Sequence, residues 1–314
     1  MPQQVIQQLA TRKLGGALQA KTPEAHSSWM PCVPNAQTDH VHLNRDAPIL
    51  GSMNSMQTRL ARSLNEVSEA QSLRYNVFYK ELSAKSNAIT SLTKKDQDRF
   101  DRICDHLLVL DYGAEGAQKI VATYRLLRQE IAEQFGDFYS SSEFDLEPLL
   151  ARFSHLDFLE LGRSCILPAW RNKRTIELLW QGAWAYILQN DVDVMIGCAS
   201  LQGTDPAKLA LPLSYLYHNA RAPENWRVSA ASGRGVNMAL MDPNEIDCEK
   251  ALRSLPPLIK GYLRLGAWVS EEAVVDHQFG TTDILIVLPI ANIKQRYLNY
   301  YNAKALVHKS RVST

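Results

Sequence analysis

The sequence lacks a long hydrophobic run. A helix that spans a membrane needs about 20 consecutive apolar residues, whereas the longest candidate here, residues 284–293, is short and contains Pro289. The first residues, MPQQVIQQLATRKLGG, also lack the continuous apolar stretch and small-residue cleavage site of a secretory signal. We therefore expect a cytoplasmic protein that does not cross a bilayer.

The sequence also lacks an excess of either charge and any close pair of cysteines. Lys and Arg together number 34, against 33 Asp and Glu. No overall field would attract nucleic acid, so we expect no nucleic-acid partner. The five cysteines are an odd number, lie far apart, and show none of the close spacings that zinc or redox sites use. We expect neither a disulfide nor a metal.

Apolar residues make up 46% of the 314-residue chain, which is enough to form a substantial core. Residues 1–50 are rich in Gln, Thr, Pro, Ser and His and predict a flexible N-terminal arm. Residues 51–303 predict one domain, followed by a C-terminal tail at 304–314. Apolar residues of the arm lie near helical spacing beside basic ones, which also allows peripheral contact with anionic lipid at the inner membrane face. The alternative is a short frayed helix, which the pair Gly15-Gly16 favours.

From about residue 56 the sequence alternates between strand-like and helix-like segments, which is typical of an α/β fold. Strands are predicted at residues 56–61, 106–111 and 119–127 and in FLELGRSCILPAW, VDVMIGCAS, AVV and DILIVL. Helices are predicted at residues 66–81, 130–135 and 146–153, in TIELLWQGAWAYILQ, and near residues 206–219, 257–265 and 292–301.

A basic loop joins the strand in FLELGRSCILPAW to the helix that follows it. The loop contains Arg171, Lys173 and Arg174. The first N–H groups of a helix have no internal partner and favour anions. The loop therefore predicts a site for the phosphates of coenzyme A, or for the single phosphate of carrier-bound phosphopantetheine and the acidic protein that carries it. The alternative is a solvated basic turn.

Several segments resemble a known enzyme family. The order of strand, basic loop, helix and strand is similar to the core of the GCN5-related N-acetyltransferases (GNAT), and longer segments resemble the ornithine lipid N-acyltransferases of bacteria. These segments include SLRYNVFYKEL, LELGRSC, GCASLQGTDP and LPPLIKGYLRLGAWV and are spread over about residues 70–300. A more distant similarity to acyl-homoserine lactone synthases rests on an Arg-x-x-x-Phe pair, a later Arg and a Glu-x-x-Arg motif. In this sequence they are Arg74 and Phe78, Arg125, and Glu160 and Arg163.

The resemblance implies a GNAT-like mixed sheet flanked by helices. It also implies transfer of a 3-hydroxy fatty acyl group from acyl carrier protein to the α-amine of L-ornithine, giving lyso-ornithine lipid in the first step of ornithine lipid biosynthesis. No resident cofactor is implied, because the acyl group arrives on the carrier's phosphopantetheine. Members that use acetyl-CoA have glycines in the pyrophosphate loop, where this chain reads RNKRTI. Without Gly the backbone wraps less closely around a pyrophosphate, which favours the carrier.

Transfer to an amine needs a proton acceptor and donors for the developing oxyanion. We predict Glu160 as the catalytic base, because burial on a central strand would raise its pKa towards the useful range. The alternative is a structural ion pair with Arg163 or Arg125. The N–H groups of residues 161–165 would bind the oxyanion if the strand splays at Gly162.

An amino acid acceptor presents a carboxylate and, in ornithine, a second ammonium. Arginine suits the first and carboxylates the second. We predict that the substrate-binding residues are Arg74, Phe78, Asp101, Arg125 and Arg163. The spacing of Asp98, Asp101 and Asp105 does not decide which of the three faces the site.

A covalent acyl-enzyme on Cys165 or Cys198 is disfavoured, because neither has a His at a motif-like position. Two other functions stay open. One is an acyl-homoserine lactone synthase, which would need an adenosyl-methionine pocket; the other is a non-catalytic carrier-binding module. The C-terminal third from LPPLIKGYLRLGA onward favours ornithine acylation over the first, and the combination of Glu160, Arg125 and Arg163 weighs against the second.

Overall fold

A computed structural model describes residues 43–113 and 118–301. Nearly all of the predicted arm, with its proposed lipid contact, and the whole predicted C-terminal tail lie outside these residues. β1 begins at Ile49, inside the segment predicted as arm. None of the described helices is both long and apolar enough to cross a membrane.

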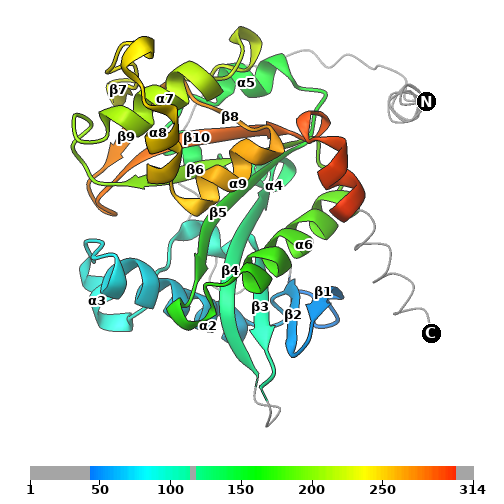
Figure 1. Cartoon of the computed structure of the whole chain (residues 1–314). Coiled ribbons are helices and arrows are strands. Elements are labelled where there is room, and N and C mark those ends of the chain that lie inside the picture. The colour runs from blue at the N-terminus through cyan, green and yellow to red at the C-terminus, as the bar shows by residue number, and fades with distance from the viewer. Residues whose placement is uncertain (1–42, 114–117, 302–314) are drawn as a thin grey trace, which may run out of the picture. The chain divides into compact units, whose positions relative to one another are not determined.

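The described residues form one mixed sheet of ten strands flanked by helices (Figure 1), which confirms the predicted fold class. Its order is β1-β2-β3-β4-β5-β6-β10-β9-β7, and β8 also pairs with β10. All neighbours are antiparallel except β5 and β6. The strands are β1 Ile49–Met53, β2 Met56–Leu60, β3 Asp105–Asp111, β4 Lys119–Arg128, β5 Phe158–Ile166, β6 Val194–Gln202, β7 Gly235–Asn237, β8 Trp268–Val269, β9 Glu272–Asp276 and β10 Thr281–Pro289.

Helices cover both faces of the sheet. α6 packs against β1 to β4, α2 packs against β4, and α9 packs against β10. The named helices are α2 Leu64–Tyr75, α3 Ala88–Thr93, α4 Gln129–Phe135, α5 Glu147–Arg152, α6 Lys173–Gln189, α7 Ala210–Ala220, α8 Cys248–Ser254 and α9 Pro257–Leu265. A final helical segment begins at residue 295. The predicted helix at 66–81 is α2 continued by the π-helix Asn76–Glu81.

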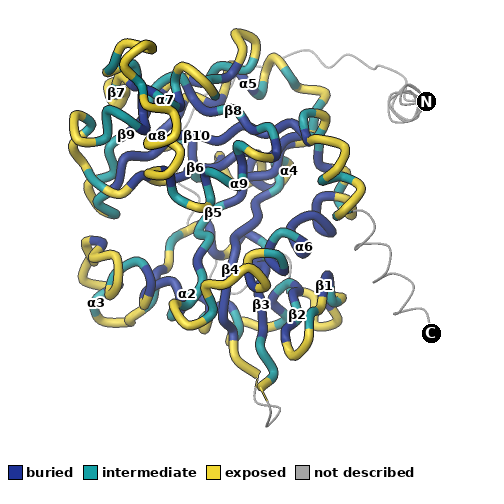
Figure 2. The backbone as a smooth tube through the Cα atoms, in the orientation of Figure 1, coloured by how far each residue is buried: buried dark blue, intermediate teal, exposed yellow. Residues whose placement is uncertain are grey.

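The alternation of side chains along each strand divides the core between the two faces. In β3, Leu107 and Val109 join the cluster that contains α6, whereas Leu108 and Leu110 join the cluster beneath α2. β10 is buried at every position, as the dark tube in Figure 2 shows. A strand buried on both faces is apolar throughout, so an acid within it stands out.

The sheet opens between β5 and β6. The two strands pair only from Phe158 to Glu160, opposite Val194–Ile196, after which β6 continues beside β10. The ladder between β4 and β5 shifts register here, and Arg163 takes a left-handed conformation with φ of 53°. At Gly197 an added Cβ would lie 2.2 Å from the carbonyl oxygen of Leu161, so only glycine fits this close approach. The strand therefore splays close to Gly162, as the oxyanion hypothesis requires.

Candidate active site

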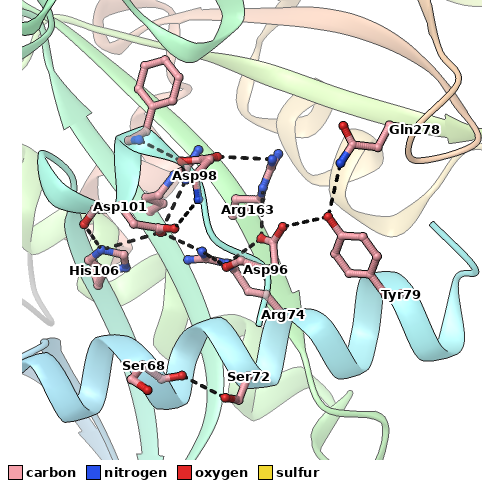
Figure 3. Close-up of polar contacts among 12 residues, drawn as sticks. Ser68, Ser72, Arg74, Tyr79, Asp96, Asp98, Asp101, His106, Arg163 and Gln278 are labelled. Atoms are coloured by element: carbon pink, nitrogen blue, oxygen red, sulfur yellow. Dashed lines mark hydrogen bonds and ion pairs between the residues drawn. The ribbon is translucent and has the colours of Figure 1, made fainter. Parts of the chain in front are cut away.

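A buried network of ions lies beside this opening. Arg74, at the end of α2, donates from Nε to Asp96 Oδ2 at 2.8 Å and from Nη2 to Asp101 Oδ1 at 2.7 Å. Arg125, on β4, donates from Nη1 to Asp98 Oδ1 at 2.7 Å. The local sequence holds the acids in place, because Asp98 and Asp101 form a reciprocal capping box around residues 99–102. Figure 3 shows Arg74, Asp96, Asp98, Asp101 and Arg163 pointing toward one another from α2, β5 and the segment before β3.

The arginines and aspartates of the network balance one another's charge. Burial by itself would raise the pKa of Asp101, but Arg74 and Arg125 hold it below its usual value. His106 contacts the Asp101 carbonyl oxygen at 2.9 Å, and burial lowers the pKa of its imidazole to about 4. The predicted substrate residues Arg74, Asp101 and Arg125 therefore lie together, and they bind one another.

Arg163 is the most accessible of the three predicted arginines. Its side chain is 14% exposed, compared with 0% for Arg74 and 3% for Arg125. Its guanidinium lies 4.6 Å from the Tyr139 ring and 4.7 Å from the Phe279 ring, in cation–π contact with both. It also lies 3.2 Å from Asp96 Oδ2.

Phe78 contributes through packing. Its ring meets the Phe279 ring edge-on at 5.8 Å. The neighbouring Tyr79 donates to Asp96 at 3.2 Å and accepts from Gln278 at 3.3 Å (Figure 3). The predicted Phe78 thus links α2 to the β9–β10 turn that carries Phe279.

Glu160 is 4% exposed and is held by the 3-10 helix Tyr139–Ser142. Its carboxylate accepts from the N–H of Tyr139 at 2.8 Å, from the N–H of Ser140 at 2.7 Å, and from the Ser140 hydroxyl. Burial raises its pKa, although these donors oppose the shift. In the described residues Glu160 forms no salt bridge with Arg125 or Arg163, so backbone and hydroxyl donors stand where the alternative interpretation expected an ion pair.

A second acidic group, which the sequence did not reveal as a site, lies near Glu160. Glu143, Asp276 and Asp283 place one carboxylate oxygen each within 4.8 Å of the other two. Burial, followed by the charge of Asp283, raises the pKa of Glu143 to about 7. Burial also raises the pKa of Asp283. The available signal was one acid directly before the apolar run of the strand TTDILIVLP.

Both candidate thiols are poorly suited to nucleophilic attack. Burial raises the pKa of Cys165 to about 12 and that of Cys198 well above its ordinary value. A protonated thiol is a weak nucleophile. These shifts agree with the argument against a covalent acyl-enzyme.

The predicted basic loop divides into two parts. Arg171 is paired with Glu81, with Nη2 and Oε2 2.6 Å apart. Lys173 and Arg174 instead line an open cavity of about 520 Å³ together with Trp170. Asn172 caps α6 by accepting from the N–H groups of Arg174 and Thr175. The cavity therefore lies at the start of α6 and is lined by two basic side chains of that helix.

Residues 73–181 match the model of the Acetyltransferase (GNAT) domain, which, with the splayed mixed sheet, defines an acyltransferase of the GNAT class. The chain is 53% identical over 267 residues, 84% of its length and 90% of the relative's, to L-ornithine N(alpha)-acyltransferase of Rhizobium meliloti (strain 1021). The protein of the same name from Rhodobacter capsulatus is 38% identical, covering 80% of this chain and 96% of that one. The chain belongs to the L-ornithine N(alpha)-acyltransferase family, which confirms the resemblance in its sequence.

Solved structures also resemble the chain. An N-acyl amino acid synthase from uncultured soil microbes has a TM-score of 0.44 and 9% identity, covering 75% of this chain and 92% of that one. The acyl-homoserine lactone synthase LasI has a TM-score of 0.38 and 14% identity, covering 74% and 89%.

Proposed function

We propose that this enzyme transfers a 3-hydroxy fatty acyl group from acyl carrier protein to the α-amine of L-ornithine, giving lyso-ornithine lipid. The observation that carries the proposal is the 53% identity to a curated L-ornithine N(alpha)-acyltransferase across 90% of that protein. The geometry agrees with it: a buried carboxylate, backbone N–H groups at a splayed strand and an accessible arginine lie in one region. This combination suits acyl transfer from a thioester to the amine of an amino acid.

In the proposed reaction the unprotonated α-amine attacks the thioester carbonyl, the new C–N bond forms, and the C–S bond breaks to release the carrier thiol. Glu160 takes the proton from the attacking nitrogen and passes it to the departing thiolate. A carboxylate has about four acceptor positions, and the three donors on Glu160 leave room for one more. The N–H groups of β5 beyond Glu160, where it no longer pairs with β6, stabilise the developing oxyanion.

Arg163 is the candidate that holds the acceptor's carboxylate. It combines access with a position three residues after Glu160, and the two rings that flank it fix its orientation. Arg74, Asp101 and Arg125 support Arg163 through Asp96 and Asp98, so they act as positioning residues. Phe78 supports Phe279 in the same way.

The donor site is proposed at the start of α6. Lys173 and Arg174 line the cavity there and suit the phosphate of phosphopantetheine and the acidic surface of a carrier. Arg171 is tied to Glu81 and shapes the loop.

The test is a reaction of purified enzyme with 3-hydroxyacyl carrier protein and ornithine. Mass spectrometry of the product should show acylation of the α-amine with the side-chain amine free. Acylation confined to the side-chain amine, or reaction only with adenosyl-methionine, would reject the proposal. Efficient use of acyl-CoA in place of acyl carrier would reject the donor.

A further inference from the structure

The acidic trio, Glu143, Asp276 and Asp283, lies outside the part of the site described so far. Glu143 follows the 3-10 helix that holds Glu160, Asp276 ends β9, and Asp283 lies on β10. Glu143 is 4% exposed and Asp283 5%. Asp276 is partly exposed at the β9–β10 turn, where it accepts from the N–H groups of Gln278 and Phe279. The trio is therefore a buried group of acids with one edge toward the surface.

Two buried oxygens on β10 have no hydrogen-bond partner. One is Asp283 Oδ1 and the other is the hydroxyl oxygen of Thr281, on the same face of the strand two residues earlier. The Thr281 and Ser200 hydroxyls lie close enough to Asp283 to oppose the rise of its pKa, but the Thr281 hydroxyl and Oδ1 are not in hydrogen-bond geometry with any described group. Buried polar atoms normally find partners, so Asp283 Oδ1 indicates a missing donor and the Thr281 hydroxyl a missing partner of either kind.

Within the described residues, no ion pair balances the charge of the trio. In the described parts of the chain no Lys or Arg nitrogen is recorded in a salt bridge with Glu143, Asp276 or Asp283. Two arginines act on the trio without pairing with it: Arg234 opposes the pKa shift of Glu143, and Arg163 opposes that of Asp283. Arg234 is bonded to the Ser142 carbonyl oxygen at 2.6 Å. Uncompensated buried carboxylates are costly unless a ligand brings the opposite charge.

We infer that the acidic trio binds the side-chain ammonium of the diamino acid acceptor. This inference rests on the proposed function and names the group that the site recognises. Three oxygens that each accept from one ammonium at about 2.8 Å lie roughly 4.6 Å apart. The trio's oxygens lie within 4.8 Å of one another, which is compatible with that arrangement.

A short chain of contacts joins the trio to Glu160, the proposed base. Ser140 donates its hydroxyl to Glu160, and Cys198 Sγ lies 3.3 Å from that hydroxyl oxygen and 3.4 Å from Glu143 Oε2. Three short contacts thus connect Glu160 to the trio. The two nitrogens of ornithine are five bonds apart, roughly 6 Å when extended. With its distal ammonium at the trio, ornithine would present its α-amine toward Glu160.

The acids suggested by the sequence are less suitable. Asp98 and Asp101 already bind arginines, and Asp105 accepts from the Tyr186 hydroxyl at 2.6 Å. The distal ammonium is therefore assigned to acids from β9, β10 and the segment before α5.

The experiment compares ornithine with 2-aminopentanoic acid, which is ornithine without its terminal amine. Wild-type enzyme should prefer ornithine by at least about 10-fold in kcat/KM, because the trio's oxygens stay unpaired with the analogue. Glu143→Gln and Asp283→Asn should each remove most of that preference, chiefly through a higher KM for ornithine. Glu147→Gln, an exposed acid four residues from Glu143, is the matched control.

A binding readout keeps the test independent of turnover and of folding. Ornithine should raise the Tm of the wild type and of Glu147→Gln more than that of Asp283→Asn, all three being folded without ligand. An unchanged ornithine preference in both trio variants would overturn the inference while leaving the proposed function intact. Failure of the wild type to acylate any amine would instead reject the proposed function. If Ca²⁺ or Mg²⁺ alone raised the wild-type Tm and the trio variants lost that response, the trio would be a metal site and the inference would be wrong.

Discussion

Two groups of buried carboxylates lie in this site, and they differ in how their charge is balanced. Asp96 and Asp101 each have an Arg74 nitrogen within 2.8 Å. Glu143 and Asp283 are as deeply buried, yet in the described residues no arginine or lysine is recorded in an ion pair with either. The pKa values follow this difference: that of Asp101 is lowered and those of Glu143 and Asp283 are raised.

This difference indicates which group of acids supports the site and which group recognises the substrate. A network whose charges balance one another rigidifies its surroundings and has little charge to offer a ligand. Its charges balance even though Arg74 Nη1, His106 Nδ1 and Arg163 Nε have no hydrogen-bond partner in the described residues. A group with unpaired acceptors costs stability until a ligand completes it, which is typical of a binding site. On this reasoning the paired network positions Arg163, and the unpaired trio meets the substrate.

The largest effect should follow from breaking the paired network. Arg74→Met would leave Asp96 and Asp101 buried without their shared cation, so we expect a loss of about 3–5 kcal/mol in the free energy of unfolding. Urea unfolding measures this loss, and Arg264→Met, at an exposed arginine on α9, serves as control. A loss below about 1 kcal/mol would show that the network does not hold the site together.

The next largest effect should come from Glu160. Glu160→Gln should lower kcat by about 10²-fold or more at neutral pH, with a smaller loss at high pH, where the amine arrives unprotonated. The amide would also place a donor against the N–H groups of Tyr139 or Ser140, so unfolding must be measured beside the rates. A pH profile of kcat that matches the wild type would remove Glu160 from the role of base.

The fold was predictable where the pattern is local. β3, β4 and α6 have clear periodicity and were predicted within a few residues. The short elements β1, β7, β8, α3 and α8 were missed, because segments of two to seven residues carry little periodicity and depend on their neighbours. The sequence could only offer Gly162 as a position where β5 can bend away from its neighbour. Where β5 stops pairing with β6 is visible only in the folded sheet.

The site was predictable only in part, for a topological reason. Arg74, Arg125, Glu160 and Arg163 stand out through motif spacing, but their partners do not. Asp283 is 140 residues from Glu143 in sequence and reaches it only because β10 pairs with β6, which places Asp283 opposite Ser200. No local pattern encodes that contact.

The raised pKa of Glu143 predicts a stability that falls as the pH rises, whereas a lowered pKa such as that of Asp101 predicts the opposite dependence. The pKa of Glu143 in the folded enzyme, about 7, lies above its unfolded value, so the folded state keeps a proton that the unfolded state releases first. Stability without substrate should therefore fall by about 2 kcal/mol as the pH rises from 5 to 7. Glu143→Gln should flatten this decline, measured as Tm against pH. An identical decline in the variant would show that Glu143 does not titrate in this range.

The smallest expected effect extends the comparison to the surface, where Arg171 is paired with Glu81 while Lys173 and Arg174 line the open cavity. Lys173→Glu with Arg174→Glu should raise KM for the acyl carrier by about 10-fold and weaken its salt dependence, because exposed charges steer an acidic partner and are screened by salt. The value of kcat at saturating carrier should change little. Reversing two exposed charges on α8, with Lys250→Glu and Arg253→Glu, gives the matched control. Equal effects of the two double reversals on KM would mean that the protein's net charge, rather than this loop, attracts the carrier.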